Sequence, residues 1–200
     1  MRFEFIAGAL CLDFANTIHD ARAEDNEEEL HSVADLLKWA KEAGLLSSAA
    51  SDRLNEHYRH NPREATTALA KAVAVRDLLL SLFAGVANHR SVSSQRLSEL
   101  NSALAETPGT MQVRNKSGRV ETEWTSVGNG LEQVLFAVLT NAAELLASER
   151  VRRIRECASA NCTWLFVDES RNRSRRWCDM AACGNRMKAR RHYRRAKAAR

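Results

Sequence analysis

The chain has no apolar run long enough to cross a bilayer. A membrane-spanning helix needs about 18 to 20 predominantly apolar residues, and the longest candidate run covers only residues 78–87. The apolar patch at the start also lacks secretory-signal character, because Glu4 and Asp13 interrupt it and Leu10 stands where a small residue would precede cleavage. We therefore expect a cytoplasmic protein without membrane contact, in a reducing compartment where thiols remain available for metal.

The sequence also lacks the short motifs of several enzyme classes. It contains no Gly-x-Ser-x-Gly turn, no phosphate-binding loop and no dinucleotide-binding glycine pattern. It has no internal repeat and no low-complexity linker. We predict that the protein is not an enzyme; scattered carboxylates such as Asp13 and Asp77 leave a catalytic pocket as the weaker alternative.

Charge is divided unevenly along the chain. Residues 150–200 hold 16 Lys and Arg against 4 Asp and Glu, a net charge of +12. Residues 1–149 hold 14 basic and 21 acidic residues, a net charge of −7. A basic segment beside an acidic body favours a polyanionic partner, and nucleic acid is the first candidate. A solvated basic tail without a partner is the alternative.

Four of the five cysteines form two short pairs within the basic segment. Cys157 and Cys162 make one C-x4-C pair, Cys178 and Cys183 make another, and fifteen residues separate the pairs. Two pairs at this spacing predict one tetrahedral Zn²⁺ site, and four thiolates would leave no open position for catalysis. The predicted cofactor is therefore one structural zinc ion, which would supply much of the folding free energy of so small a module. Two disulfides or four buried thiols are the alternatives.

The rest of the sequence predicts a mainly α protein with a small β-hairpin. Apolar periodicity and capping residues predict helices over 32–44, 47–60, 62–89, 93–106 and 131–155. Alternation on both sides of residues 116–118 predicts the hairpin. We place a helical N-terminal domain at 1–152 and a zinc finger at 153–200.

Within the finger, a β-prone run at 163–168 and a basic helix at 185–197 complete a treble-clef-like arrangement around the cysteine pairs. Arginine neutralises phosphates and also reads guanine edges. The predicted nucleic-acid-binding residues are Arg171, Arg173, Arg175, Arg176, Arg186, Lys188, Arg190, Arg191 and Arg194. Their charge covers more than one face of the predicted helix, which favours phosphate contacts over base reading.

A polar group near the N-terminus is the other candidate site. Asp13 and Asn16 lie beside apolar residues in the segment LDFANT, and Arg76 lies within the long predicted helix. Together they could form a ligand pocket, although a helix cap or turn explains Asp13 and Asn16 equally simply. Cys11, the odd cysteine, is interpreted as a small buried side chain rather than a nucleophile.

The residues around Cys183 carry a family resemblance. With CGNR at 183–186, the preceding C-x4-C pair and RRWCDM before it, residues 155–195 resemble the CGNR zinc-finger family. Upstream, G-x-LCLDFANT at 8–17 and RDLL at 76–79 resemble the helical ABATE domain that accompanies this finger in bacterial proteins. The resemblance implies a stress-induced transcription regulator, with Cys157, Cys162, Cys178 and Cys183 matching the metal cysteines.

The leading hypothesis is therefore a zinc-dependent DNA-binding regulator with a helical sensor or dimerisation domain. An RNA-binding finger is a close variant, because a basic finger alone does not separate the two nucleic acids. A zinc-stabilised protein-interaction module, whose basic tail engages an acidic partner, is the other alternative. A small-molecule effector and a homodimer are left open.

Overall fold

The computed structural model describes residues 3–19, 27–107, 109–116, 119–126 and 130–189. Its α-helices are α1 (Leu10–Ala15), α2 (Val33–Glu42), α3 (Ser48–His60), α4 (Pro62–Ala87), α5 (Ser94–Ala105) and α6 (Gly130–Ala147). Its strands form three antiparallel pairs, β1–β2 (Ile18–His19, Glu27–Glu28), β3–β4 (Gly109–Lys116, Arg119–Ser126) and β5–β6 (Ile154–Glu156, Leu165–Val167). Two further turns of helix are η1 (Glu149–Arg153) and η2 (Met180–Gly184). The expectation of a mainly α protein with a small β-hairpin and a C-terminal finger is confirmed.

Local residue chemistry fixes the ends of these helices. Ser32, Ser47 and Ser93 occupy the N-cap positions of α2, α3 and α5, and each hydroxyl accepts a backbone N–H of the first turn. Pro62 begins α4, where its missing N–H costs nothing. After α2, Gly44 takes a positive φ of 76°, which stops the helix at the place expected from the sequence.

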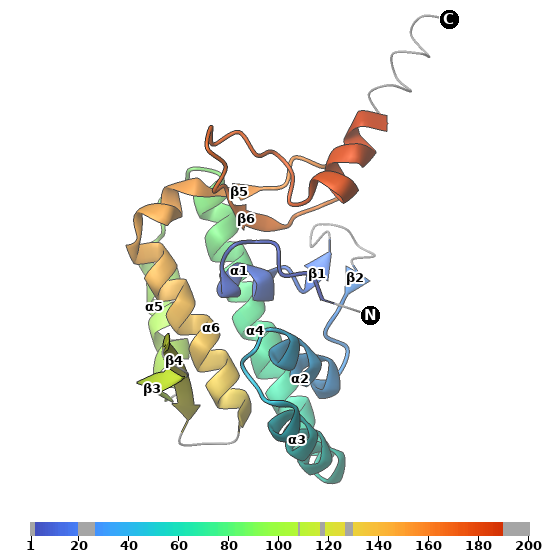
Figure 1. Cartoon of the computed structure of the whole chain (residues 1–200), viewed down its shortest axis with the longest axis vertical. Coiled ribbons are helices and arrows are strands. Elements are labelled where there is room, and N and C mark those ends of the chain that lie inside the picture. The colour runs from blue at the N-terminus through green and yellow to red at the C-terminus, as the bar shows by residue number, and fades with distance from the viewer. Residues whose placement is uncertain (1–2, 20–26, 108, 117–118, 127–129, 190–200) are drawn as a thin grey trace, which may run out of the picture.

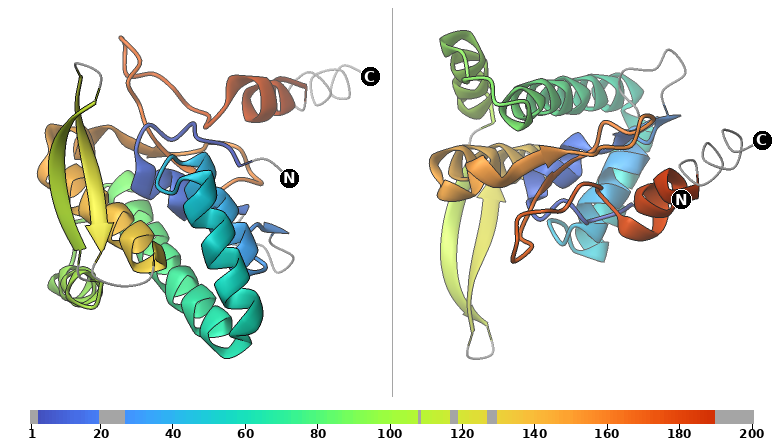
Figure 2. Two further views of the ribbon diagram at one scale, coloured as in Figure 1. Left: turned by 60° about the horizontal axis from the view of Figure 1, so that its bottom comes forward. Right: turned by 90° about the horizontal axis from the view of Figure 1, so that it is seen from above.

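Helices α4 and α6 run side by side through the middle of the molecule, with α1 packed against both (Figure 1). Buried side chains from these three helices, together with Trp39 and Leu37 of α2, form the core. The β3–β4 hairpin packs along α6 and extends past it (Figure 2). Among the described helices, α6 alone has the length and hydropathy of a membrane span, but Val134, Val138 and Ala142 are fully buried in this core.

The last predicted helix is shorter than expected. Apolar periodicity predicts a helix that extends to residue 155, whereas α6 ends at Ala147 and η1 and β5 follow. Ser148 caps η1 through its hydroxyl, which accepts the Arg150 N–H at 3.2 Å. Ile154 must then adopt an extended conformation because it pairs with Val167 across the β5–β6 ladder. The arginines at 150–155 therefore belong to η1 and β5 and do not form the last turn of α6.

Candidate metal centre

The first cysteine pair lies in the loop of the β5–β6 hairpin. Cys157 directly follows β5, and two residues separate Cys162 from the start of β6. The backbone N–H of Cys157 donates to the carbonyl of Trp164 at 2.9 Å, which closes the loop that contains both cysteines. The β-prone run at 163–168 contains β6, but β6 pairs with β5, which precedes the first cysteine pair. The loop of this hairpin therefore carries the first two ligands, and the run does not form a hairpin with the residues that follow it as far as Cys178.

The second pair begins a short helical segment. Cys178 precedes η2, and Cys183 lies within it. Asp179 caps η2 through its carboxylate, which accepts the N–H of Ala182 at 2.5 Å. The helix then continues through residues 185–189, the described part of the basic helix expected over 185–197.

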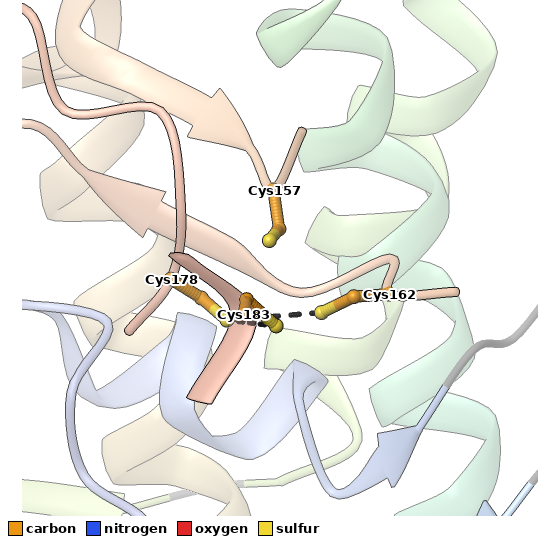
Figure 3. A group of neighbouring side chains, drawn as sticks. All are labelled: Cys157, Cys162, Cys178 and Cys183. Carbon is orange, nitrogen blue, oxygen red and sulfur yellow. Dashed lines mark hydrogen bonds between the residues drawn. The ribbon is translucent and has the colours of Figure 1, made fainter. Parts of the chain in front are cut away.

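The four sulfur atoms converge on one small volume (Figure 3). The Sγ atoms of Cys162 and Cys178 are 3.7 Å apart, and those of Cys178 and Cys183 are 3.6 Å apart. A tetrahedral zinc ion with Zn–S bonds of about 2.3 Å requires sulfur–sulfur separations of about 3.8 Å. All four sulfurs lie within 4.8 Å of one another, so the cluster fits one ion with only a small contraction.

The thiols of Cys157, Cys162 and Cys178 do not release their protons independently, because they are hydrogen-bonded to one another. Hydrogen bonds from Cys162 and Cys178 lower the pKa of Cys157. The same bonds raise the pKa of Cys162 and Cys178, because each retains the proton that it donates. A bound divalent cation stabilises several neighbouring thiolates at once. The donor set therefore suits a zinc ion, and all four cysteines are buried, as expected for a structural site.

The body of the protein encloses the finger hairpin. The indole Nε1 of Trp164 donates to the carbonyl of Ile18 at 3.1 Å, and the N–H of Val167 donates to the carbonyl of Ala7 at 2.8 Å. The four cysteines belong to the same buried apolar cluster as α1, α4 and α6. The metal centre is thus part of the main core. The predicted boundary between a helical domain at 1–152 and a zinc finger at 153–200 stays a prediction.

A buried carboxylate organises the basic loop between the cysteine pairs. Asp168 accepts the N–H and hydroxyl of Ser170 at 3.0 and 2.5 Å through Oδ1, and the N–H of Arg175 at 3.0 Å through Oδ2. Desolvation alone would raise the pKa of Asp168. Together these hydrogen bonds lower it by a larger amount, so the pKa of Asp168 lies below its ordinary value. Within this loop Arg173 adopts a positive φ of 50°, a backbone conformation that non-glycine residues seldom adopt.

The structure separates the predicted phosphate-binding residues into three groups. Arg171, Arg173, Arg176, Arg186 and Lys188 are exposed. Arg175 instead donates to the carbonyls of Trp177, Cys178 and Ile6, and its guanidinium lies 4.3 Å from the centre of the Phe166 ring. Those contacts give Arg175 a structural role. Arg190, Arg191 and Arg194 lie outside the described residues.

Each of the three residues of the predicted ligand pocket has hydrogen-bond partners within the protein. Asp13 is 8% exposed and accepts the N–H of Ala7 at 2.9 Å. Asn16 is bonded to the backbone of Leu165. Arg76 lies elsewhere, with Nη1 at 2.5 Å from the carboxylate of Glu28 and Nε at 3.0 Å from that of Asp77. Asp13 therefore makes a local contact of the kind expected for a turn, whereas Asn16 ties the N-terminal segment to β6.

Arg76 does line a cavity of about 610 Å³ between α4, the β1–β2 pair and the finger. Glu156 and Thr163, which stand next to the first two cysteines, form its far wall. Asn88 spans this space through a 3.1 Å hydrogen bond from Nδ2 to the Glu156 carboxylate. Sequence reasoning missed this junction because Glu28, Asn88 and Glu156 belong to no motif and meet only through the fold.

A mainly helical body with a four-cysteine zinc centre defines a structural zinc-finger protein. The CGNR zinc-finger model matches residues 153–196, and the ABATE model, described as "putative stress-induced transcription regulator", matches residues 8–149. The chain belongs to the ABATE family, with a CGNR zinc finger at its C-terminal end. Its cofactor is one structural Zn²⁺, held by the cysteine cluster. No curated protein matches the chain.

Proposed function

We propose that this protein is a DNA-binding transcription regulator whose zinc finger contacts phosphates through exposed cations. The observation that supports this proposal most directly is the fixed loop held by Asp168. It presents Arg171, Arg173 and Arg176 to solvent. Arginines on an ordered loop lose less conformational entropy when they bind phosphate than arginines on a mobile one.

A second cationic element lies close to this loop in the chain. Arg186 and Lys188 are exposed on the helix that starts at the second cysteine pair. Figure 1 places the loop and this helix at the same end of the molecule, away from α3. None of these five cations forms an ion pair with a described carboxylate. Their charge is therefore available to phosphate groups.

In this proposal zinc has a structural task. It fixes both ends of the loop, at Cys162 and Cys178, and the start of the following helix at Cys183. The helical body serves as a sensor or dimerisation domain, the protein acts in the cytoplasm, and it has no catalytic activity. The cavity beside Arg76 is the place where an effector would contact both the body and the finger.

Fluorescence anisotropy with a labelled 30-base-pair DNA duplex tests the proposal. The zinc-loaded protein is titrated at NaCl concentrations from 50 to 300 mM, with and without a chelator. Five phosphate contacts predict a slope of about −4.5 for log affinity against log salt concentration. The double variant Arg171→Gln/Arg176→Gln should reduce this slope by about 2. Arg53→Gln/Arg59→Gln, which removes two exposed arginines from α3, is the charge-matched control and should leave the slope unchanged.

Absence of binding by zinc-loaded protein at 50 mM salt would overturn the proposal. Equal loss of affinity in the control variant would show a nonspecific charge effect without a defined surface. A duplex RNA of the same sequence separates the nucleic acids, because preference for RNA would support the alternative function instead.

A further inference from the structure

A second cavity lies at the end of the body farthest from the finger. It has a volume of about 410 Å³ and is lined by residues from the C-terminal end of α3 and the N-terminal parts of α4 and α6. Figure 1 shows these parts of the three helices at the opposite end of the molecule from the finger. Tyr58 of α3, Ala68 of α4, and Leu131 and Leu135 of α6 supply its apolar wall. This volume falls within the range of roughly 300 to 1,000 Å³ that is usual for small-molecule sites.

The Tyr58 hydroxyl has no partner in this structure. The residue is 3% exposed, and its oxygen has less than 1 Å² of accessible surface and no hydrogen bond. Tyr58 and Ser51 are the buried residues of α3, so the tyrosine ring anchors this helix to the body. A phenylalanine would provide the same apolar contact without leaving a buried hydroxyl unsatisfied, which typically costs a protein stability. Packing therefore explains the ring but not the hydroxyl.

We infer that this cavity binds a small, uncharged, mainly apolar molecule whose hydrogen-bond acceptor takes the proton of the Tyr58 hydroxyl. The side chains around the cavity carry balanced charge, Arg63 and Lys71 against Glu64 and Glu132. Such a setting does not favour a ligand of either sign. The apolar wall favours a ligand that contains one or two rings, and the hydrogen bond from the Tyr58 hydroxyl fixes the orientation of that ligand.

The hydroxyl acts as the donor in this contact. Burial, with Glu64 and Glu132 nearby, raises the pKa of Tyr58, so the group keeps its proton at neutral pH. Both carboxylates line the same cavity as Tyr58. A ligand reaches the hydroxyl when the long side chains that line the cavity, Arg63, Lys71 and Glu132, move aside. Of these, Lys71 is held by a single 2.9 Å hydrogen bond to the Glu106 carbonyl.

Two probes of nearly equal size test the inference. Benzophenone carries a carbonyl acceptor, and diphenylmethane lacks it. The full-length zinc-loaded protein is titrated with each probe below its solubility limit, and binding is followed by the change in melting temperature and by calorimetry. One neutral hydrogen bond to a buried donor predicts roughly 5-fold tighter binding of benzophenone than of diphenylmethane.

Two variants make the result specific to this cavity. In Tyr58→Phe the preference for benzophenone should disappear, whereas the unfolding midpoint without probe should stay the same or rise, because an unpaired buried hydroxyl has been removed. Ala68→Leu keeps the hydroxyl but fills the space, and should abolish binding of both probes. Since Tyr58→Phe retains the aromatic ring, loss of folding does not confuse the comparison.

Three results would overturn the inference. One is the absence of binding by either probe. Another is an equal preference for benzophenone in the wild type and in Tyr58→Phe, which would show that the benzophenone carbonyl does not contact the Tyr58 hydroxyl. The third is a lower stability of Tyr58→Phe without probe, together with no preference in the wild type, which would show that a buried water molecule already satisfies the hydroxyl.

Discussion

The side chain of Asn16 pairs with both backbone groups of Leu165. Its Nδ2 donates to the Leu165 carbonyl at 2.9 Å, and its Oδ1 accepts the Leu165 N–H at 2.8 Å. Asn16 ends α1, and Leu165 begins β6, 149 residues later. Because β6 belongs to the hairpin that carries Cys157 and Cys162, this pair ties the start of the chain to the metal centre.

Replacing Asn16 with alanine should therefore destabilise the whole protein. Asn16 is 3% exposed, so the change leaves two buried backbone groups without partners, at a cost of about 1 to 3 kcal/mol each. We expect a loss of about 2 to 4 kcal/mol in the free energy of unfolding, measured by urea titration of the zinc-loaded protein. Asn101→Ala, at an exposed position of α5, is the matched control and should change stability by less than about 0.5 kcal/mol. Similar losses in both variants would contradict the structural role of Asn16.

Removal of zinc should affect the body as well as the finger. A structural zinc site contributes about 10 to 16 kcal/mol of apparent binding free energy, comparable with the total stability of a domain. Since the cysteines lie in the main core, Cys162→Ser or chelation should lower the melting temperature of the helical body, followed by circular dichroism at 222 nm. Cys11→Ala is the control, because Cys11 is equally buried but lies outside the cluster, and this variant should still bind one zinc ion per chain. An unchanged helical transition after zinc removal would show that the finger folds separately.

Asp168 provides a test in which charge and structure predict opposite results. Asp168→Ala removes a negative charge from the basic finger, and charge alone would then strengthen DNA binding. We expect weaker binding, by about 3- to 10-fold, because the loop loses the acceptor of three hydrogen bonds and its arginines must be ordered on binding. Glu169→Ala removes a neighbouring exposed charge that bonds Arg150 and is the charge-matched control. Stronger binding by both variants would show that the fixed loop is unimportant.

The sequence contained most of the local information in this fold. The serine caps, Pro62 and Gly44 predicted the helix ends correctly, because these signals act within one turn of backbone. The cysteine spacing likewise predicted the metal centre, since each pair needs only a short loop to reach one ion. The helix that ends at Ala147 was predicted too long because its end is set by the pairing of Ile154 with Val167, a contact that apolar periodicity does not contain.

The polar contacts between distant segments were not predictable in the same way. Arg175 and Arg176 are adjacent and chemically identical, yet only Arg175 reaches the carbonyl of Ile6 and the ring of Phe166. The role of Asn16 depends on where β6 passes, which requires the tertiary structure. The role of Asp168 had the clearest sequence signal of these contacts. A carboxylate that ends a β-prone run shortly before a serine commonly forms such a turn.

The buried carboxyl of Asp13 predicts a pH dependence with a definite sign. Burial raises the pKa of Asp13 from 3.8 to about 6, although the backbone N–H groups of Ala7 and Ile6 partly oppose the shift. Between about pH 4 and pH 6 the folded chain therefore keeps a proton that the unfolded chain has released. Stability from this group is present at low pH and is lost as the pH rises through 6.

Asp13→Asn should remove this dependence while keeping an oxygen that can accept the Ala7 N–H. Relative to the variant, the wild type should be more stable at pH 4 than at pH 7, by on the order of 2 kcal/mol. The measurement is the difference in unfolding free energy between the two proteins at each pH, because acid weakens zinc binding in both and the difference cancels that loss. A difference that stays constant from pH 4 to pH 7 would mean that the Asp13 carboxyl ionises with its ordinary pKa, and that its bonds to the Ala7 and Ile6 amides outweigh burial.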